Sequence, residues 1–446
     1  MFQKILIANR GEIAVRIIRA CREMGIKTVA VYSEADRDAL HAQLADEAVC
    51  IGPAAAQESY LNMERILSAT IATKAEAIHP GFGFLSENSK FVEMCEKCNV
   101  TFIGPSAAVI NKMGNKSEAR RTMMEAGVPV VPGTKEPVYT VEEALKEAEK
   151  IGFPIMIKAS SGGGGKGMRI SESREDFEEN FSTAQRESVN AFADNTMYLE
   201  RYVSRPRHIE VQIIADRFGQ VVQLGERDCS IQRRHQKMIE ESPSCAISEE
   251  LRRKMGETAV RAAKAVGYES AGTIEFLLDK SGEFFFMEMN TRIQVEHPVT
   301  EFVSGVDLVK EQIRVAAGLP LSVKQEDICM RGHAIECRIN AENPAKNFMP
   351  CPGVIENLHV PGGNGVRIDT AVYNGYQIPP NYDSMIMKVI VHDKDRASAI
   401  AKMRSTLGEV IIEGVQTNLD FQYDILNQKD FLDGNVTTHF IEEHYE

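Results

Sequence analysis

Two acidic residues and an amide stand in neighbouring apolar segments and could hold a divalent cation. Glu275 lies in AGTIEFLLD, and Glu288 and Asn290 lie in EFFFMEMN. A two-residue turn at 281–282 would pair the segments and place all three side chains on one face, with the two carboxylates opposite each other. Facing carboxylates are unfavourable unless a cation lies between them, and these oxygens suit Mg²⁺ or Mn²⁺. We therefore predict a metal site, although an ordinary solvated face is the alternative.

The same alternation continues beyond these segments in NTRIQVEHPVTE. Arg292, Gln294 and Glu296 follow one another at two-residue steps. A carboxylate beside an arginine and a metal ion can act as a general base. By residue pattern alone, Glu296 fits a structural ion pair equally well.

A run of glycines, SSGGGGKG at 160–167, separates two strand-like segments. Because glycine has no Cβ, its backbone N–H groups can approach phosphate oxygens closely, and Lys158 and Lys166 add positive charge. The run is not a P-loop, because no Ser or Thr follows the lysine. Successive glycines cost much backbone entropy in a simple hairpin tip. We therefore expect a mobile lid over a nucleotide.

The segment 226–241, ERDCSIQRRHQKMIEE, concentrates basic residues in an acidic chain. In an extended conformation Arg233, His235 and Lys237 share one face, and Gln232 and Arg234 share the other. A charged edge strand is the ordinary interpretation. The clustering favours an anion site.

The whole chain of 446 residues has a net charge of −13, with 43% hydrophobic and 26% charged residues. At roughly 100–200 residues per domain, this length predicts two to four folded units. An acidic surface repels phosphate backbones, so we expect no nucleic-acid partner. The N-terminus lacks a signal-peptide pattern and no long apolar run predicts a membrane span. The nine scattered cysteines need no disulfide framework, so we expect a cytoplasmic protein.

Alternating strands and helices are predicted over the first hundred residues. The strands are KILIAN, Lys27–Val31, Ala77–His79 and Thr101–Ile103, and the first helix follows Gly11 and ends at Gly25. This pattern is typical of a parallel, doubly wound α/β sheet. The turn at Gly11 lacks the GxGxxG motif of a dinucleotide site, so we do not predict NAD binding.

A second unit is predicted to begin at the Pro- and Gly-rich stretch 129–133. Helix Val141–Ile151 and the strands FPIMIKA and TMYLERYV belong to it. A third, strand-rich unit begins near Ser204.

Together these motifs resemble those of the biotin carboxylases, which are ATP-grasp enzymes. The resemblance spans the whole chain and rests on the following segments: KILIANRGEIAVRIIRA, HPGFGFLSEN, KASSGGGGKGMRI, ERDCSIQRRHQK, EMNTRIQVEHPVTE, RGHAIECRINAE and NYDSMIMK. It implies an α/β (α+β) ATP-grasp fold with a doubly wound N-terminal pre-ATP-grasp domain at 1–114. A linker and glycine-loop lid at 115–203, an ATP-grasp core at 204–330 and a mixed C-terminal domain at 331–446 would follow.

The resemblance also implies a reaction. Biotin carboxylases make carboxyphosphate from ATP and bicarbonate and then carboxylate N1′ of biotin on a carrier protein, using two Mg²⁺ or Mn²⁺ ions. Glu296 matches the base that deprotonates bicarbonate, and Arg338 matches the residue that stabilises the biotin enolate. The residues that match the bicarbonate site are Lys237, Arg292, Gln294, Val295 and Glu296.

The metal ligands implied by the resemblance are again Glu275, Glu288 and Asn290. The residues that match the nucleotide site are Lys116, Lys158, Gly163, Gly164, Gly165, Lys166, Gly167, Glu200, Arg201, Val203, His208, Gln232, His235, Glu275, Leu277 and Glu288. Phe82 stands near biotin where some relatives have tyrosine, so a hydroxyl contact is lost there. Lys166 replaces an arginine of the loop and keeps its charge without bidentate geometry.

The expected partners are a biotin carboxyl carrier protein, the carboxyltransferase subunits of acetyl-CoA carboxylase and a second copy of the chain. No biotin-attachment Ala-Met-Lys-Met follows the last predicted domain, which favours a separate subunit. Three alternatives stay open: the corresponding part of a pyruvate or propionyl-CoA carboxylase, a ligase that joins a carboxylate to an amine, and a nucleotide-binding regulator without catalysis.

Overall fold

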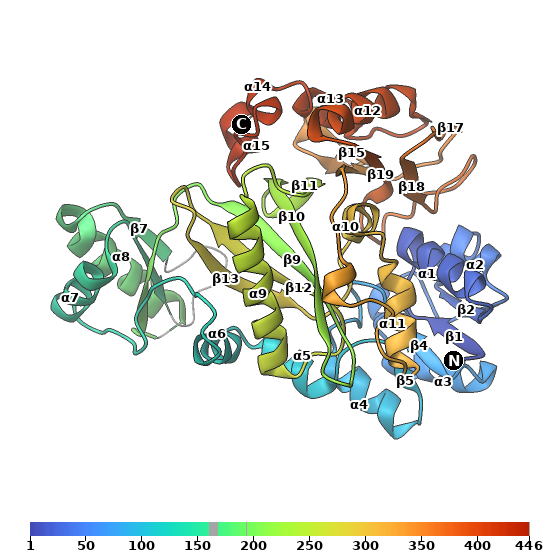
Figure 1. Cartoon of the computed structure of the whole chain (residues 1–446), viewed down its shortest axis with the longest axis horizontal. Coiled ribbons are helices and arrows are strands. Elements are labelled where there is room, and N and C mark those ends of the chain that lie inside the picture. The colour runs from blue at the N-terminus through green and yellow to red at the C-terminus, as the bar shows by residue number, and fades with distance from the viewer. Residues whose placement is uncertain (160–167, 193, 446) are drawn as a thin grey trace. The chain divides into compact units, whose positions relative to one another are not determined.

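The computed structural model describes residues 1–159, 168–192 and 194–445 (Figure 1). Its contacts divide the chain into two compact units. The large unit comprises Met1–Val128, Arg207–Phe276 and Glu288–Glu446, and the small unit comprises Pro129–Pro206 and Leu277–Met287. The small unit thus begins at the predicted boundary. The predicted phosphate-loop residues Gly163, Gly164, Gly165, Lys166 and Gly167 lie outside the described residues.

A five-stranded sheet of order β3-β2-β1-β4-β5 forms the N-terminal part of the large unit. Its strands are β1 (Lys4–Ile7), β2 (Lys27–Tyr32), β3 (Glu47–Cys50), β4 (Ala77–His79) and β5 (Thr101–Phe102), and its helices are α1 (Gly11–Glu23), α2 (Leu40–Leu44), α3 (Met63–Thr73), α4 (Ser89–Lys97), α5 (Ala107–Gly114) and α6 (Lys116–Glu125). Neighbouring strands are parallel. The prediction of a doubly wound sheet is confirmed. Sequence reasoning missed β3, because its residues stay accessible and form no apolar run.

The second sheet has eight strands in the order β13-β12-β9-β10-β11-β14-β19-β18. Their bounds are β9 (Arg207–Ala215), β10 (Val221–Arg233), β11 (Gln236–Ser242), β12 (Ser270–Leu278), β13 (Phe284–Asn290), β14 (His333–Asn340), β18 (Val366–Thr370) and β19 (Met385–Asp393). The run from β9 to β18 pairs antiparallel throughout. The C-terminal strands therefore extend the same sheet that carries most of the predicted site residues.

Seven further helices and two short sheets complete the described part of the large unit. The helices are α9 (Glu249–Val266), α10 (His297–Ser304), α11 (Leu308–Ala316), α12 (Arg396–Glu409), α13 (Leu419–Ile425), α14 (Lys429–Leu432) and α15 (Phe440–Tyr445). The two-stranded sheets join β15 (Glu342–Asn343) to β16 (Met349–Pro350) and β17 (Asn357–His359) to β20 (Ile411–Glu413). None of the helices in the described residues is long and apolar enough to cross a bilayer.

Local sequence explains where the longest of these helices begins and ends. Ser248 caps α9 by accepting a hydrogen bond from the backbone N–H of Leu251, and Gly267 ends the helix in the left-handed conformation.

The small unit is built on a three-stranded antiparallel sheet of order β7-β6-β8. Its elements are β6 (Ile155–Ala159), β7 (Met168–Ser171), β8 (Met197–Arg201), α7 (Val141–Ile151) and α8 (Arg174–Phe192). Alternate residues of β6 pack against Phe177 and Phe181 of α8 in the core of the unit. The predicted bounds of α7 are confirmed.

The segment 226–241 is extended on either side of a turn that the sequence analysis did not predict, in which Arg234 and His235 have positive φ between β10 and β11. That turn brings Gln232 directly opposite Lys237. Between β12 and β13, the Asp279 N–H donates to the Glu283 carbonyl, so three residues rather than two form the turn. The Asp279 carboxylate stabilises it by accepting from the Ser281 and Glu283 N–H groups.

Candidate active site

Lys237 of β11 lies at the centre of a cluster of buried carboxylates in the large unit. Its Nζ is 2.6 Å from Oε2 of Glu210, 2.7 Å from Oε1 of Glu296 and 2.9 Å from Oε1 of Glu275. The cluster thus joins residues of β9, β11 and β12 to Glu296, which precedes α10. The structure therefore brings together three predicted site residues that are far apart in the chain.

The charges of this cluster fix its protonation. Burial alone would lower the pKa of Lys237, but Glu210, Glu296 and Glu275 raise it well above its usual value. Burial would likewise raise the pKa of Glu296, but Lys237, Arg338 and Arg227 hold it well below the usual range. Lys237 is therefore an ammonium ion and Glu296 a carboxylate at neutral pH. The unprotonated form of Glu296 is the one that can accept a proton.

Arg338 of β14 holds the other oxygen of Glu296. Its Nη2 donates to Oε2 of Glu296 at 2.8 Å, and its Nε lies 2.6 Å from Oε1 of Glu240. Glu240 is fully buried, and burial raises its pKa to about 7 although the charge of Arg338 opposes this. A guanidinium beside Glu296 can stabilise an anion formed next to it.

Arg292 organises the neighbouring loop. It donates to the side-chain oxygens of Gln294 at 2.8 Å and Asn290 at 3.1 Å, and its Nε donates to Glu87 at 2.9 Å. Glu87 also accepts from the N–H and hydroxyl of Thr291. Sequence reasoning missed Glu87 as a site residue, because its partners are more than two hundred residues away.

Two of the three predicted metal ligands, Glu275 and Asn290, are in direct contact. The side-chain amides of Asn290 and Gln294 donate to Oε1 of Glu275 at 2.8 and 3.1 Å. Burial, and then repulsion by the negative charge of Glu275, raise the pKa of Glu288. Oxygen donors from Glu275, Glu288 and Asn290 are the set that Mg²⁺ or Mn²⁺ prefers, and a cation would relieve this repulsion. The residues therefore fit the predicted metal, provided that the Asn290 amide turns its oxygen inward.

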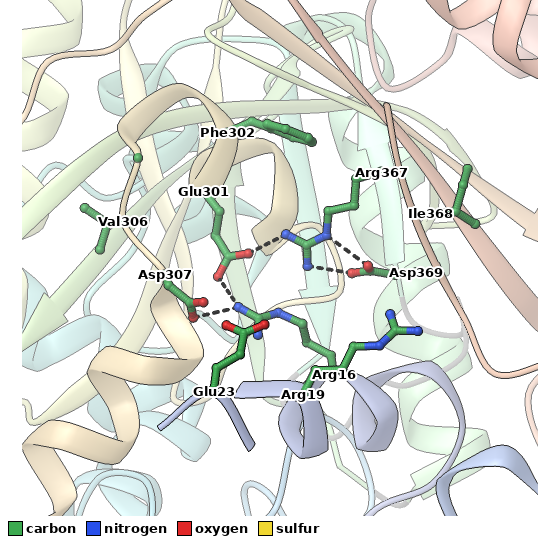
Figure 2. Close-up of a pocket in the computed structure, with 11 residues that line it drawn as sticks. Arg16, Arg19, Glu23, Glu301, Phe302, Val306, Asp307, Arg367, Ile368 and Asp369 are labelled. Atoms are coloured by element: carbon green, nitrogen blue, oxygen red, sulfur yellow. Dashed lines mark hydrogen bonds and ion pairs between the residues drawn. The ribbon is translucent and has the colours of Figure 1, made fainter. Parts of the chain in front are cut away.

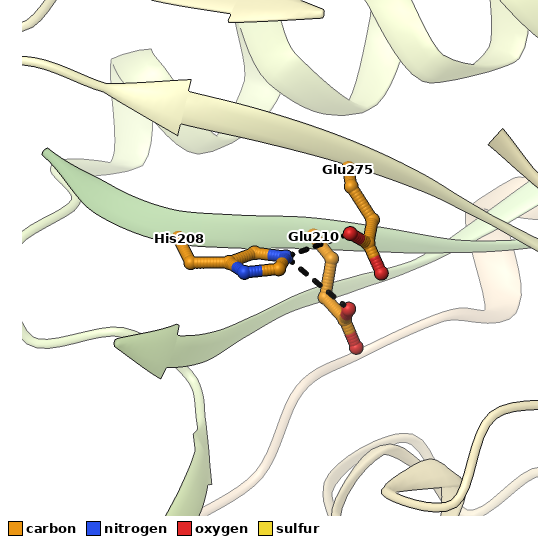
Figure 3. A group of neighbouring side chains, drawn as sticks. All are labelled: His208, Glu210 and Glu275. Atoms are coloured by element: carbon orange, nitrogen blue, oxygen red, sulfur yellow. Dashed lines mark ion pairs between the residues drawn. The ribbon is translucent and has the colours of Figure 1, made fainter. Parts of the chain in front are cut away.

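His208 and Glu210 of β9 lie on the same face as Glu275 of β12 (Figure 3). The Nε2 atom of His208 is 2.9 Å from Oε2 of Glu275 and 3.9 Å from Oε2 of Glu210. Sequence reasoning missed Glu210. Its two-residue spacing from His208 within a strand was the signal that could have found it.

The other residues predicted to bind the nucleotide are divided between the two units. In the small unit Lys158 pairs with Glu200, Arg201 pairs with Asp279 at 3.0 Å, Val203 is buried and Leu277 is half-buried. In the large unit Gln232 is buried, whereas Lys116 at the start of α6 and His235 in its turn are exposed. Phe82 is half-buried against the core of the N-terminal sheet.

Three family models match successive parts of the chain. They are "Biotin carboxylase, N-terminal domain" at residues 1–110, "Carbamoyl-phosphate synthase L chain, ATP binding domain" at 115–324 and "Biotin carboxylase C-terminal domain" at 336–443. The chain belongs to the biotin carboxylase family. It is thus an ATP-grasp enzyme of the carboxylating ligase class, as the sequence motifs imply.

Relatives and solved structures match over nearly the full length. Biotin carboxylase 1 of Bacillus subtilis (strain 168) is 58% identical over 443 residues, which is 99% of this chain and 98% of the relative. A pyruvate carboxylase subunit from Methanothermobacter thermautotrophicus is 54% identical, and the match covers 100% of this chain and 90% of the relative. The biotin carboxylase domain dimer of Hydrogenobacter thermophilus 2-oxoglutarate carboxylase, solved with MgADP, ADP and bicarbonate, superposes with a TM-score of 0.88 at 51% identity, covering 100% of this chain and 98% of that one.

A separate pocket of about 380 Å³ lies beside α1 and β18 in the large unit (Figure 2). Arg367 of β18 donates to Glu301 at 2.7 Å and to both oxygens of Asp369, and Arg16 of α1 is 3.0 Å from Glu301. Arg16 and Arg367 are paired with Glu301, Asp307 and Asp369, so the positive charge of these two arginines is balanced within the pocket. These ion pairs connect α1, α10 and β18.

Proposed function

We propose that the chain is the biotin carboxylase subunit of an acetyl-CoA carboxylase, which carboxylates biotin on a biotin carboxyl carrier protein. The observation that carries the proposal is the contact of Lys237 and Arg338 with the two oxygens of Glu296. A base held between two cations, beside a carboxylate pair suited to a metal ion, serves the activation of a small anion by ATP.

Glu296 would accept the hydroxyl proton of bicarbonate. A bicarbonate oxygen then attacks the γ-phosphorus of ATP, and the bond to the bridging oxygen breaks to give carboxyphosphate and ADP. In this site Lys237, Arg292, Gln294 and Val295 would hold the bicarbonate. When Lys237 and Arg338 turn towards the bound bicarbonate, they stabilise the Glu296 carboxylate less. The pKa of Glu296 then rises, and Glu296 becomes a stronger base.

The carboxyl group would next pass from carboxyphosphate to N1′ of biotin: the new N–C bond forms as the bond to the phosphate oxygen breaks, and the released phosphate takes up the N1′ proton. Loss of that proton leaves negative charge on the ureido oxygen. The guanidinium of Arg338 would stabilise this charge, and Phe82 would lie against biotin without offering a hydroxyl.

Glu275, Glu288 and Asn290 would hold Mg²⁺ or Mn²⁺, with two ions bound together with ATP. The metal supplies charge neutralisation on the transferred phosphoryl group. We propose nucleotide contacts for the remaining matched residues: Lys116, Lys158, Gly163, Gly164, Gly165, Lys166, Gly167, Glu200, Arg201, Val203, His208, Gln232, His235 and Leu277. We also propose the domain division 1–114, 115–203, 204–330 and 331–446.

The choice of acetyl-CoA carboxylase is supported by relatives that are named as biotin carboxylases with no other carboxylase in the name, such as those of Bacillus subtilis and Haemophilus influenzae. A pyruvate carboxylase is the alternative, favoured by the match to the protein from Methanothermobacter thermautotrophicus. We further propose carboxyltransferase subunits as partners and a homodimer, since the Hydrogenobacter domain is described as a dimer.

The test is phosphate release from ATP with Mg²⁺, with and without bicarbonate and free biotin. Release that requires bicarbonate and rises with biotin is expected. ATP binding without this dependence would contradict the proposed substrates. Adding purified carboxyltransferase with acetyl-CoA, pyruvate or propionyl-CoA then identifies the final acceptor.

A further inference from the structure

The loop that carries Glu296 is held by its backbone carbonyls. Residues 291–296 connect β13 to α10 without helix or strand structure, so no ladder of backbone hydrogen bonds fixes them. Instead, Nδ1 of His297 donates to the Gln294 carbonyl at 2.8 Å, and Nζ of Lys388 donates to the Val295 carbonyl at 2.7 Å. The second contact comes from β19, more than ninety residues away, and acts on the residue directly before Glu296.

Lys388 is fully buried, with a relative exposure of 0%. The carboxylates nearest its ammonium are those of Glu12 at 3.4 Å and Asp369 at 3.8 Å, both longer than the contact with Val295. Burial lowers the pKa of Lys388, but Glu12, Glu336 and Asp369 more than offset this, so the pKa is raised and the side chain is charged. A buried charged donor on a neutral carbonyl is a strong, directional restraint.

The sheet aligns Lys388 with the residue that holds the Glu296 side chain. In the antiparallel register Lys388 is directly opposite Arg338 on β14 and directly opposite Asp369 on β18. Two adjacent cations on one face therefore hold consecutive parts of the same loop: Arg338 the carboxylate of Glu296 and Lys388 the preceding carbonyl. Asp369 is itself fixed by Arg367, as Figure 2 shows.

We propose that Lys388 is a positioning residue for the reaction, which sets the peptide plane between Val295 and Glu296 and thereby the direction of the Glu296 carboxylate. The inference rests on the proposed role of Glu296 as base. A misplacement of about 1 Å at a reacting group can lower the rate about 100-fold, so a single buried hydrogen bond at this point matters for turnover.

The experiment compares K388M with K402M in the full chain. Lys402 makes the same kind of bond, from Nζ to the His392 carbonyl at 2.7 Å, but on α12 and away from Glu296. K388M is expected to lower kcat for bicarbonate-dependent ATP cleavage by about 30-fold, with KM for ATP within about twofold of wild type. K402M is expected to stay within about twofold of wild type in both quantities.

A double-mutant cycle separates positioning from a general folding defect. If Lys388 acts through Glu296, adding K388M to E296A lowers the residual ATP cleavage by less than about threefold. Equal losses from K388M in the two backgrounds, or identical behaviour of K388M and K402M, would overturn the proposal. Should K388M not fold, K388M/E12Q removes the cation together with one of its anions and carries the same comparison. Failure of both to fold means that Lys388 serves stability alone, which also overturns it.

Turnover of the E296A variant distinguishes failure of the proposed role of Glu296 from failure of the proposed role of Lys388. Wild-type turnover in E296A contradicts the proposed role of Glu296. A large loss in E296A with normal turnover in K388M contradicts only the inference about Lys388.

Discussion

Replacing Lys237 with methionine removes the cation that Glu210, Glu275 and Glu296 share at 2.6–2.9 Å. The three carboxylates are buried, and only 12% of the Lys237 side chain is exposed, so water would compensate poorly for loss of the ammonium. Removing one partner of a buried ion pair costs about 3–5 kcal/mol. We expect K237M to lower the free energy of unfolding by this amount at pH 8.

This deficit should depend on pH. In the wild type the pKa of Glu275 and that of Glu296 are lowered, against the effect of burial, chiefly by the charge of Lys237. Without Lys237, burial and mutual repulsion raise these pKa values above those of the unfolded chain. A carboxylate of that kind contributes stability at a pH below its unfolded pKa and loses it as the pH rises through the folded value. The deficit of K237M is therefore smaller at pH 5.5 than at pH 8.

The assay is urea unfolding at both pH values, followed by circular dichroism because the chain has no tryptophan. K429M is the matched control, since Lys429 pairs with Asp433 on the surface with 87% of its side chain exposed. Its effect should stay within about 0.5 kcal/mol. The reasoning is refuted if K237M costs less than about 1 kcal/mol, or if its deficit is the same at both pH values.

Three further predictions follow from the same site. E288Q should raise the Mg²⁺ concentration for half-maximal phosphate release about tenfold, and an unchanged Mg²⁺ dependence would contradict the ligand assignment. R338A should lower biotin carboxylation about 100-fold but slow ATP cleavage without biotin only about tenfold, because it loses the proposed enolate contact in addition to its contact with Glu296; equal losses in the two assays would argue against that role. Burial raises the pKa of Glu240 to about 7, whereas the pKa of a glutamate in the unfolded chain is about 4.3. The wild type should therefore lose stability as the pH rises from about 4.3 towards 7. E240Q should flatten this decline in urea unfolding at pH 5.5 and 7.5, and an equally steep decline would show that Glu240 is not its source.

Much of the fold could be read from local patterns. The apolar strands and intervening helices of the first hundred residues predict a parallel sheet, and α7 has the bounds that its helical pattern predicts. Sequence reasoning failed where local signals were absent. Strand β3 has no apolar run, and the turns at 234–235 and 280–282 depend on which backbone groups pair across each hairpin.

The chain's own residue types determined the chemistry that its site can perform. Glu275, Glu288 and Asn290 are oxygen donors at strand spacing, and Glu296 follows them in the same alternation. Short-range periodicity suffices for this, because successive side chains of a strand point to opposite faces.

Only the tertiary structure decided which distant groups control these residues. Lys237, Arg338 and Lys388 come from three different strands, and each reaches Glu296 or the carbonyl before it. Their contacts depend on the order and register of the eight-stranded sheet, which local sequence patterns do not encode. Because a buried charge takes its pKa from neighbours within a few ångströms, the ionised state of Glu296 also follows from this assembly and not from its position in the chain.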